Sequence, residues 1–403
     1  MRPGGATGAG TVLDLIRTGA AVTRSQVMLQ TGLARSTVAQ RLDALLDAGY
    51  ITEAPSGDSA RGRPTSILGV NRRAGVILVA DLGASHMRCA VTDLTTALLA
   101  ERTSEIDIAD GPDTVLAAVE AAFWALLEEI GRSRRDVRGV GLGVPGPVEF
   151  TTGRVVSPPI MTGWDGYAIP GYFARTLDCP VLVDNDVNLM ALGEHRACWP
   201  EASHLLFVKA GTGVGAGLVL SGAVHRGTLG GAGDVGHIPA PLTTELHGTP
   251  PVCRCGNRGC IEAYAGGWAL VRDLRAAGVD VETVRDVVRA TRAGDLTAQR
   301  AVRDAGRVLG HAVADVVSLL NPSVVVVGGD LAHAEVRLLP GIREVVYQRA
   351  LPLATLDLQI TASRLDDRAG VLGAATMVTD ALFEPARVDA ALYERATAVA
   401  AAG

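Results

Sequence analysis

Three cysteines and a histidine form a group whose residue types and spacing suit metal binding. Cys253, Cys255 and Cys260 lie within eight residues of a glycine-rich segment, and His237 lies upstream of them. Glycines let the backbone turn so that three sulfur atoms can converge on one point. Three thiolates and one imidazole make a closed tetrahedral set of soft ligands, which favours a structural zinc ion over a catalytic metal. His247 is nearer to the cysteines in sequence, but we favour His237 because it follows a Gly-Asp-Val-Gly turn.

A second group of polar residues suits contacts with DNA. Five of them share one face of a helix that we expect over residues 34–48, namely Arg35, Ser36, Thr37, Gln40 and Arg41. Arginine can pair bidentately with guanine and glutamine with adenine, while serine and threonine hydroxyls can hold phosphates. The apolar residues of the helix lie on the opposite side. This distribution is typical of a helix that enters the major groove.

The segments around that helix predict a winged helix-turn-helix domain over residues 1–72. Two further helices are expected over residues 11–17 and 24–30. Gly32 then allows the tight turn that leads into the third helix.

A polar loop between two short strands completes the expected domain as a wing. The strands are expected over residues 50–53 and 66–70. Within the loop, Arg61 and Arg63 flank a glycine, a shape that suits a narrow minor groove. The alternative is a winged helix used for dimerisation or protein contact, with its arginines merely solvated.

The charges of the chain are unevenly distributed. Residues 1–75 hold nine arginines against five carboxylates, whereas the remainder holds 28 basic and 38 acidic residues. A polyanion would therefore attract the head and repel the rest of the chain. We find no apolar run long enough to span a membrane and no apolar signal core, so we expect a cytoplasmic protein without membrane contact.

From residue 76 onward, strand-like apolar runs alternate with long helical stretches. Strands are expected in two similar rounds, first at residues 76–81, 140–144 and 181–183, and then at 205–209, 216–220 and 324–327. This alternation predicts an α/β body with two lobes around a cleft. We expect the first lobe over residues 76–190 and 366–384, and the second lobe, with the zinc loop, over residues 191–365.

Over nearly its whole length the chain resembles the ROK (repressor, open reading frame, kinase) family, in a form similar to its actinobacterial regulators. Several short motifs carry the resemblance together: 143–147 (Gly-Val-Pro-Gly-Pro), 185–188 (Asn-Asp-Val-Asn), 211–217 (Gly-Thr-Gly-Val-Gly-Ala-Gly), 233–237 (Gly-Asp-Val-Gly-His), 260–262 (Cys-Ile-Glu), 321–322 (Asn-Pro) and 328–329 (Gly-Gly). The resemblance implies two actin-like lobes of the sugar kinase type with a sugar cleft between them, and a homodimer or homotetramer.

The resemblance also implies a set of sugar-binding residues, namely Asn185, Asp186, Asp234, His237 and Glu262. Groups of these types can hydrogen-bond to adjacent hydroxyls and reject analogues that leave them unpaired. In the family's kinases the residue that matches Asp186 is the general base, and His237 would bind zinc through one ring nitrogen and the sugar through the other. The kinases have glutamate at the position of Asp234, so this contact is lost, water-mediated or aimed at a different sugar. As an alternative role, Asp186 and Asn188 could cap a helix expected over residues 189–195.

ATP binding in the family's kinases needs a glycine-rich turn after the first strand of each lobe, where backbone N–H groups approach phosphates. The second turn is intact, as Gly211, Thr212 and Gly213. The first reads Asp-x-Gly-Gly-Thr-Lys in the kinases, but here it is Asp81, Leu82, Gly83, Ala84, Ser85 and His86. Ala84 adds a Cβ, and His86 replaces a cation by a mostly neutral ring, although Ser85 keeps a hydroxyl. We therefore expect weakened binding of ATP and Mg²⁺.

Together these features favour a repressor that responds to a sugar or sugar phosphate and binds operator DNA through its head. Two heads in a symmetric oligomer would read an inverted repeat, with half-sites separated by whole turns of about 10 base pairs. An active ATP-dependent hexose kinase with an added head is the alternative, because Asp186 is retained. In a third hypothesis the body binds a partner protein, but this leaves the set of sugar-binding residue types unexplained. Lys209 and Arg254 are assigned no role.

Overall fold

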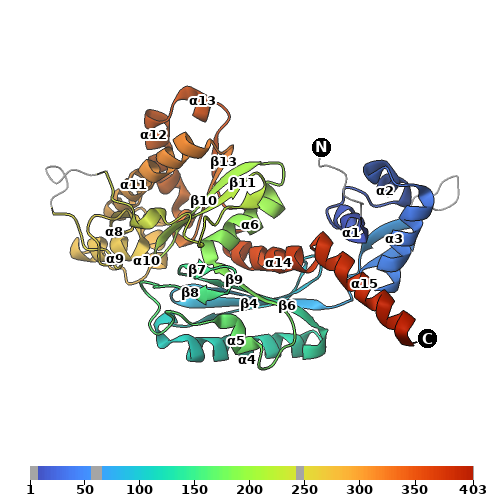
Figure 1. Cartoon of the computed structure of the whole chain (residues 1–403). Helices are drawn as coiled ribbons and strands as arrows, with labels where there is room; N and C mark the ends of the chain where they lie inside the picture. Colours follow the sequence, from blue (N-terminus) through green and yellow to red (C-terminus); the bar gives the residue numbers. More distant parts are fainter. Residues whose placement is uncertain (1–7, 56–65, 242–248, 403) are drawn as a thin grey trace.

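The chain folds into a small, mainly helical head and a larger body with two β-sheets (Figure 1). The computed structural model describes residues 8–55, 66–241 and 249–402. The head consists of α1 (Ala9–Arg17), α2 (Arg24–Thr31), α3 (Arg35–Asp47) and the antiparallel strands β1 (Ile51–Pro55) and β2 (Ser66–Val70). This is the predicted winged helix-turn-helix arrangement. Arg61 and Arg63 lie outside the described residues.

The turn between α2 and α3 forms as the sequence predicts. Thr23 caps α2, since its hydroxyl oxygen accepts a hydrogen bond of 3.2 Å from the backbone N–H of Gln26. Gly32 ends the helix with φ of 68°, a left-handed conformation that favours glycine. The head is therefore shaped by local signals within a few residues of each turn.

The body contains two five-stranded sheets with the same topology. Their strand orders are β5-β4-β3-β6-β9 and β12-β11-β10-β13-β14. In each, three antiparallel strands are followed by two strands that add in parallel. The bounds are β3 (Val76–Leu82), β4 (His86–Asp93), β5 (Leu98–Glu105), β6 (Val137–Val144), β9 (Val181–Asn185), β10 (His204–Ala210), β11 (Val214–Leu220), β12 (Ala223–Val224), β13 (Val324–Gly328) and β14 (Gln359–Ala362). This repetition confirms the predicted α/β body with two lobes.

Helices cover both faces of each sheet (Figure 1). The outer face of the first sheet carries α4 (Pro112–Glu129), and the outer side of the second lobe carries α9 (Gly267–Ala276), α10 (Val284–Arg292), α11 (Leu296–Leu320) and α12 (Glu335–Arg349). Two helices lie between the sheets: α14 (Ala369–Leu382) contacts β3 and β6, while α6 (Asp186–Cys198) contacts α14, β10 and β11. Among the described residues, no helix combines the length and apolar character needed to cross a bilayer.

The two central helices touch through their backbones. A Cβ added to Gly373 of α14 would lie 1.8 Å from the carbonyl oxygen of Leu189, and one added to Gly193 of α6 would lie 2.2 Å from that of Ala369. No side chain larger than hydrogen fits at either point. The crossing therefore holds α6 and α14 at a short, defined separation.

The C-terminal helix α15 (Pro385–Ala402) packs against the head (Figure 1). Val388 is fully buried in a cluster with apolar residues of the head, and the ring of Phe383 lies edge-on to Tyr50 with centroids 6.2 Å apart. The carboxylate of Asp389 accepts a hydrogen bond of 2.9 Å from the backbone N–H of Gly10, at the start of α1.

Gly373→Ala is expected to destabilise the body, because the new methyl group would overlap the carbonyl oxygen of Leu189 and force α6 away from α14. Overpacking of this kind costs about 1–3 kcal/mol. Urea unfolding followed by circular dichroism measures the change. Gly171→Ala is the control, since nothing lies within 4 Å of its added Cβ, and it should keep stability or raise it by up to about 1 kcal/mol. Equal stabilities of the two variants would show that the crossing is not tight.

Candidate functional site

A cavity of about 530 Å³ opens between the two lobes. It gathers residues from both sheets and from the loops between them. Among its lining residues are the five expected sugar ligands and most of both glycine turns: Asp81, Gly83, Ala84, His86, Asn185, Asp186, Gly211, Thr212, Gly213, Asp234, His237 and Glu262. Ser85 is exposed and does not line the cavity, so its hydroxyl does not take the place expected for it. The motifs scattered along the chain thus converge on one site.

Asn185 begins helix α6. Its side-chain oxygen accepts hydrogen bonds from the backbone N–H groups of Val187 (3.0 Å) and Asn188 (3.4 Å), and its amide donates to the carbonyl oxygen of Gly146 (3.1 Å). The expectation that Asp186 or Asn188 caps a helix starting at residue 189 is therefore wrong. The helix starts one turn earlier because an asparagine satisfies its first N–H groups. Asp186, in the first turn, also benefits from the positive end of the helix dipole.

Asp186 is paired with a cation from the opposite lobe. The ammonium group of Lys209, on β10, contacts its carboxylate directly. Asp81, at the end of β3, lies in the same cluster: burial and then the charge of Asp186 raise its pKa to about 7, against the opposing effect of Lys209. Burial opposes the charge of Lys209, but the two carboxylates outweigh it and raise the pKa of this group. One ammonium group thus serves two neighbouring carboxyl groups at the bottom of the cleft.

Glu262 connects the cysteine loop with the second glycine turn. One carboxylate oxygen accepts a hydrogen bond of 3.0 Å from the backbone N–H of Val214, directly after the turn, and the other accepts 3.2 Å from the indole N–H of Trp268. A Cβ on Gly213 would lie 2.6 Å from the same carboxylate. Glu262 is therefore held by two hydrogen bonds, and it positions the turn as well as lining the cavity.

The four expected metal ligands meet at one point. The Nδ1 atom of His237 lies 3.6 Å from the sulfur of Cys253, and the sulfurs of Cys255 and Cys260 lie 3.7 Å apart. All four ligand atoms are within 4.8 Å of one another. Ligands of a tetrahedral zinc ion are separated by about 3.8 Å when the Zn–S distance is about 2.3 Å. The group can therefore hold a tetrahedral metal ion. His247 lies outside the described residues.

The imidazole of His237 faces two partners. While Nδ1 faces the sulfur cluster, Nε2 lies 4.0 Å from the carboxylate of Asp234. Asp234 is exposed over more than half of its side chain, and its pKa is raised chiefly by partial burial, against the attraction of His237. This short carboxylate lines the open cavity, and no hydrogen bond to another described residue prevents its contact with a ligand.

The first glycine turn is closed by its own residues. The backbone N–H of Gly83 donates to the carbonyl oxygen of His86 (2.8 Å), and a Cβ on Gly83 would lie 2.5 Å from the imidazole ring. The ring therefore covers the turn. Burial, followed by the charge of Lys209, lowers the pKa of His86, so the ring is neutral near pH 7. This turn differs strongly from an open phosphate-binding loop.

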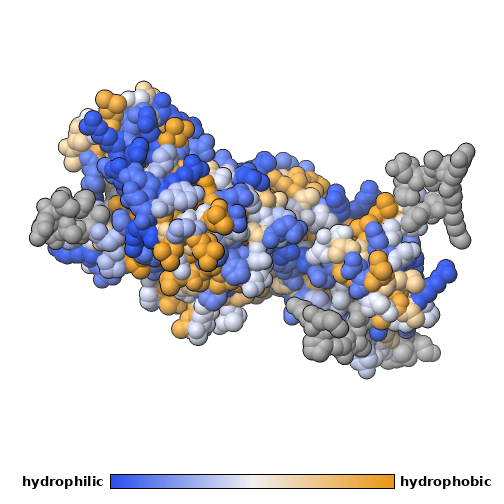
Figure 2. All heavy atoms as spheres, turned by 90° about the horizontal axis from the view of Figure 1, so that it is seen from above, coloured by the Kyte–Doolittle hydropathy of each residue, from blue (hydrophilic) through white to orange (hydrophobic). Residues whose placement is uncertain are grey.

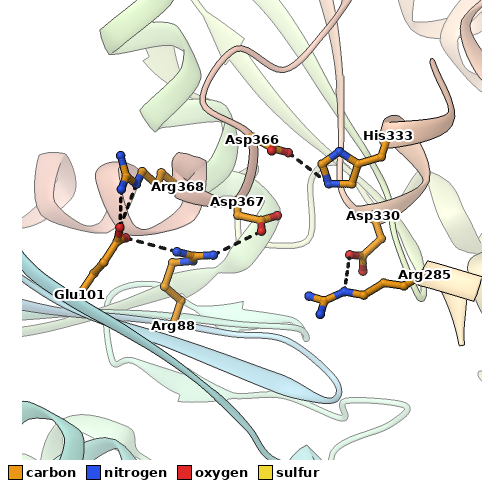
Figure 3. Close-up of polar contacts among 8 residues, drawn as sticks. All are labelled: Arg88, Glu101, Arg285, Asp330, His333, Asp366, Asp367 and Arg368. Carbon is orange, nitrogen blue, oxygen red and sulfur yellow. Dashed lines mark hydrogen bonds and ion pairs between the residues drawn. The ribbon is translucent and has the colours of Figure 1, made fainter. Parts of the chain in front are cut away.

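Several ion pairs lie at the rim next to this turn, and one of them, between His333 and Asp366, joins the two lobes (Figure 3). Arg88 of β4 contacts Glu101 of β5 (3.2 Å) and Asp367 (3.3 Å), which precedes α14. Further pairs in the view are Arg368 with Glu101, His333 with Asp366 (3.4 Å) and Arg285 with Asp330 (3.5 Å). The arginines that line this end of the cavity are thus engaged with carboxylates of the chain itself.

Sequence reasoning missed two charged contacts of the site. Lys209 gave a signal, since it is the lone charged residue of an apolar strand just before a glycine turn. The other contact is buried: Asp184 accepts a hydrogen bond of 2.8 Å from Arg226, whose guanidinium also stacks 3.9 Å from the ring centroid of Phe150. This pair anchors the loop that leads to Asp234. Arg226 is 42 residues from Asp184, so no local pattern could reveal it.

The head presents the expected polar face to solvent. On α3, Arg35, Ser36 and Gln40 are exposed, whereas Thr37 and Arg41 are half-buried. Val38, Leu42 and Leu45 are buried on the opposite side. In the space-filling view, apolar residues appear as separate patches among hydrophilic ones rather than as one continuous surface (Figure 2).

Comparison with known proteins identifies the family. Residues 77–381 match the ROK family. The chain belongs to this family. It is 31% identical over 371 residues to a putative xylose repressor of Caldicellulosiruptor sp. (strain Rt8B.4), and the match covers 89% of this chain and 91% of that protein.

Two solved structures of ROK proteins are similar over different shares of the chain. A ROK family transcriptional regulator, described as a homolog of the Escherichia coli MLC protein, matches with a TM-score of 0.80 and 26% identity, covering 96% of this chain and 98% of that one. A ROK family glucokinase from Streptomyces griseus, in complex with glucose and AMPPNP, matches with a TM-score of 0.66 and 27% identity, covering 75% and 99%. The likeness to the regulator therefore extends over about a fifth of the chain that the glucokinase does not match.

Cys255→Ser is expected to reduce bound zinc from about one ion per chain to a small fraction, because a hydroxyl group replaces one of four soft ligands. Elemental analysis of purified protein measures the metal content. Cys179→Ser is the control, as this half-buried thiol lies outside the cluster. The same metal content in both variants would contradict the assignment of the ligands.

Proposed function

We propose that the chain is a sugar-responsive transcriptional repressor. The observation that carries the proposal is the combination of two parts in one chain. A winged helix-turn-helix head with a polar helix face is joined to a ROK body whose cleft gathers the family's sugar-binding residue types. The putative xylose repressor matches 89% of the chain, and the solved ROK regulator matches 96% of it, which includes most of the head.

The head contacts operator DNA through α3 in the major groove. Arg35, Ser36 and Gln40 read base edges or hold phosphates, with Thr37 and Arg41 beside them. Arg61 and Arg63 of the wing contact the minor groove. Two heads of a homodimer or homotetramer read an inverted repeat, since a symmetric protein favours a symmetric site.

The effector is a sugar or sugar phosphate in the cleft. Asp186, Asp234 and His237 offer polar atoms to it, while Asn185 and Glu262 use much of their bonding capacity to hold α6 and the glycine turn. A zinc ion at His237 and the three cysteines is structural and orients the imidazole towards the ligand. The body divides into a first lobe of residues 76–190 and 366–384 and a second lobe of residues 191–365, with the head over residues 1–72.

A selection experiment tests this function. Fragments of the source genome are incubated with the full chain, and the bound sequences are recovered with and without D-xylose, D-glucose and N-acetylglucosamine 6-phosphate. The expected result is enrichment of an inverted repeat whose recovery changes with one of these ligands. Recovery without any sequence preference, in every condition, would overturn the proposal.

Arg35→Ala is expected to weaken binding to the selected operator by about 5- to 150-fold, because loss of a bidentate base contact costs about 1–3 kcal/mol. Fluorescence anisotropy with labelled operator measures this loss. Affinity for the sugar, measured by calorimetry, should stay the same because no residue of α3 lines the cavity. Arg135→Ala, in an exposed segment of the body, is the control and should bind the operator normally. Loss of both operator and sugar binding in Arg35→Ala would argue against separate sites.

The kinase alternative makes a distinct prediction. Lys209 neutralises the carboxylate that would act as general base, and His86 covers the first glycine turn. We therefore expect no ADP release above that of Asp186→Asn when wild-type protein is mixed with ATP, Mg²⁺ and the sugars above. A coupled spectrophotometric assay measures the release. ADP release that depends on both the sugar and Asp186 would instead establish a kinase with a DNA-binding head.

A further inference from the structure

The carboxylate of Asp380, near the end of α14, joins two other helices. One oxygen accepts a hydrogen bond of 2.7 Å from Arg17 of α1, and the other accepts 2.8 Å from Arg196 of α6. Arg17 is also held by Asp14 of its own helix at 2.9 Å. The three side chains of this bridge are 17%, 34% and 39% exposed for Arg17, Asp380 and Arg196. Asp380 therefore connects the head with both central helices of the body.

The same central helices reach the cleft at their other ends. Helix α6 begins at Asp186, in the cavity, and ends at Cys198, just beyond Arg196. Its 13 residues span about 20 Å. Helix α14 starts beside Asp81, whose carboxylate would lie 2.0 Å from a Cβ on Gly370. The two helices touch through backbone atoms at one crossing, so a displacement of α6 at the cleft pivots it about this crossing and moves Arg196 at its far end.

The bridge at Asp380 depends on the relative positions of three helix ends. Arg17 and Arg196 lie in the last turns of α1 and α6, and Asp380 lies near the end of α14. The C-terminal end of a helix carries partial negative charge, so a carboxylate there is disfavoured unless cations are close. Small shifts of α6 relative to α1 would lengthen one of the two contacts. The bridge can thus distinguish two arrangements of head and body.

We propose that the Asp380 bridge transmits occupancy of the cleft to the head, through α6 and Arg196 on one side and Arg17 on the other. This inference rests on the proposed function and assigns its regulatory link. A ligand that favours one arrangement of the lobes changes the position of α6, and the bridge passes the change to α1. Helix α15 keeps the head attached while its orientation changes, since it contacts α1 independently through Asp389.

The test compares Asp380→Asn with a matched control. Glu344→Gln removes a carboxylate that is likewise held by two arginines, Arg303 and Arg307, but lies on the outer side of the second lobe. For each protein, operator affinity is measured by anisotropy with and without D-xylose, D-glucose and N-acetylglucosamine 6-phosphate. Coupling between two sites is typically 5- to 150-fold in affinity. The ratio of operator affinities without and with sugar should be retained in Glu344→Gln. In Asp380→Asn it should fall to within about twofold of unity.

A second variant guards against a folding defect. Arg196→Met breaks only the contact with α6 and leaves the pair between Arg17 and Asp380. Like Asp380→Asn, it should lose the effect of sugar on operator affinity, while both variants bind the sugar with wild-type affinity. A full wild-type ratio in both variants would overturn the inference without touching the proposed function.

Hydrogen exchange supplies a readout that needs no ligand. In ligand-free protein, amides of α1 should exchange about tenfold faster in Asp380→Asn than in Glu344→Gln, because the head loses one of its attachments. Identical exchange in α1 would also overturn the inference. If wild-type protein shows no effect of any of the three sugars on operator binding, the proposed function fails, and the exchange result alone decides whether the bridge restrains the head.

Discussion

The backbone contact between α6 and α14 is the constraint on which the rest of the body depends. At Gly193 and Gly373 the two helices approach so closely that no side chain separates them. One pair of helices therefore lies between two sheets and contacts both lobes. The N-terminal ends of both helices lie at the cleft, and their C-terminal ends are joined to the head through Asp380. One packing interaction therefore fixes the position of the cleft relative to this attachment of the head.

The cleft differs from a phosphate-transfer site through its charges. Lys209 and Asp186 come from different lobes and neutralise each other, and Asp81 shares the same cation. Arginines at the rim are engaged with Glu101, Asp367 and Asp330. A ligand with hydroxyl groups can exchange hydrogen bonds with such a cluster without a large change in net charge. The arrangement therefore suits binding of a carbohydrate better than transfer of a phosphoryl group.

Several features of the fold and site could be predicted from sequence because their signals are local. Gly32 marks its turn, and glycines allow Cys253, Cys255 and Cys260 to converge within eight residues. Two rounds of apolar strands predicted two lobes, and the sheets repeat one topology. The start of α6 was missed by one turn, since Asn185 was interpreted as a sugar ligand and its competing role as a cap was not considered.

The sequence by itself determined the family motifs, the helix-turn-helix and the cysteine cluster that could hold a metal ion, because each depends on neighbours a few residues apart. Only the tertiary structure decided which charges meet. Lys209 is 23 residues from Asp186, Arg196 is 184 from Asp380, and Arg17 is 363 from it. Such pairs form only after separate helices and strands have packed, and the energy of an ion pair depends on distance and burial rather than on order along the chain.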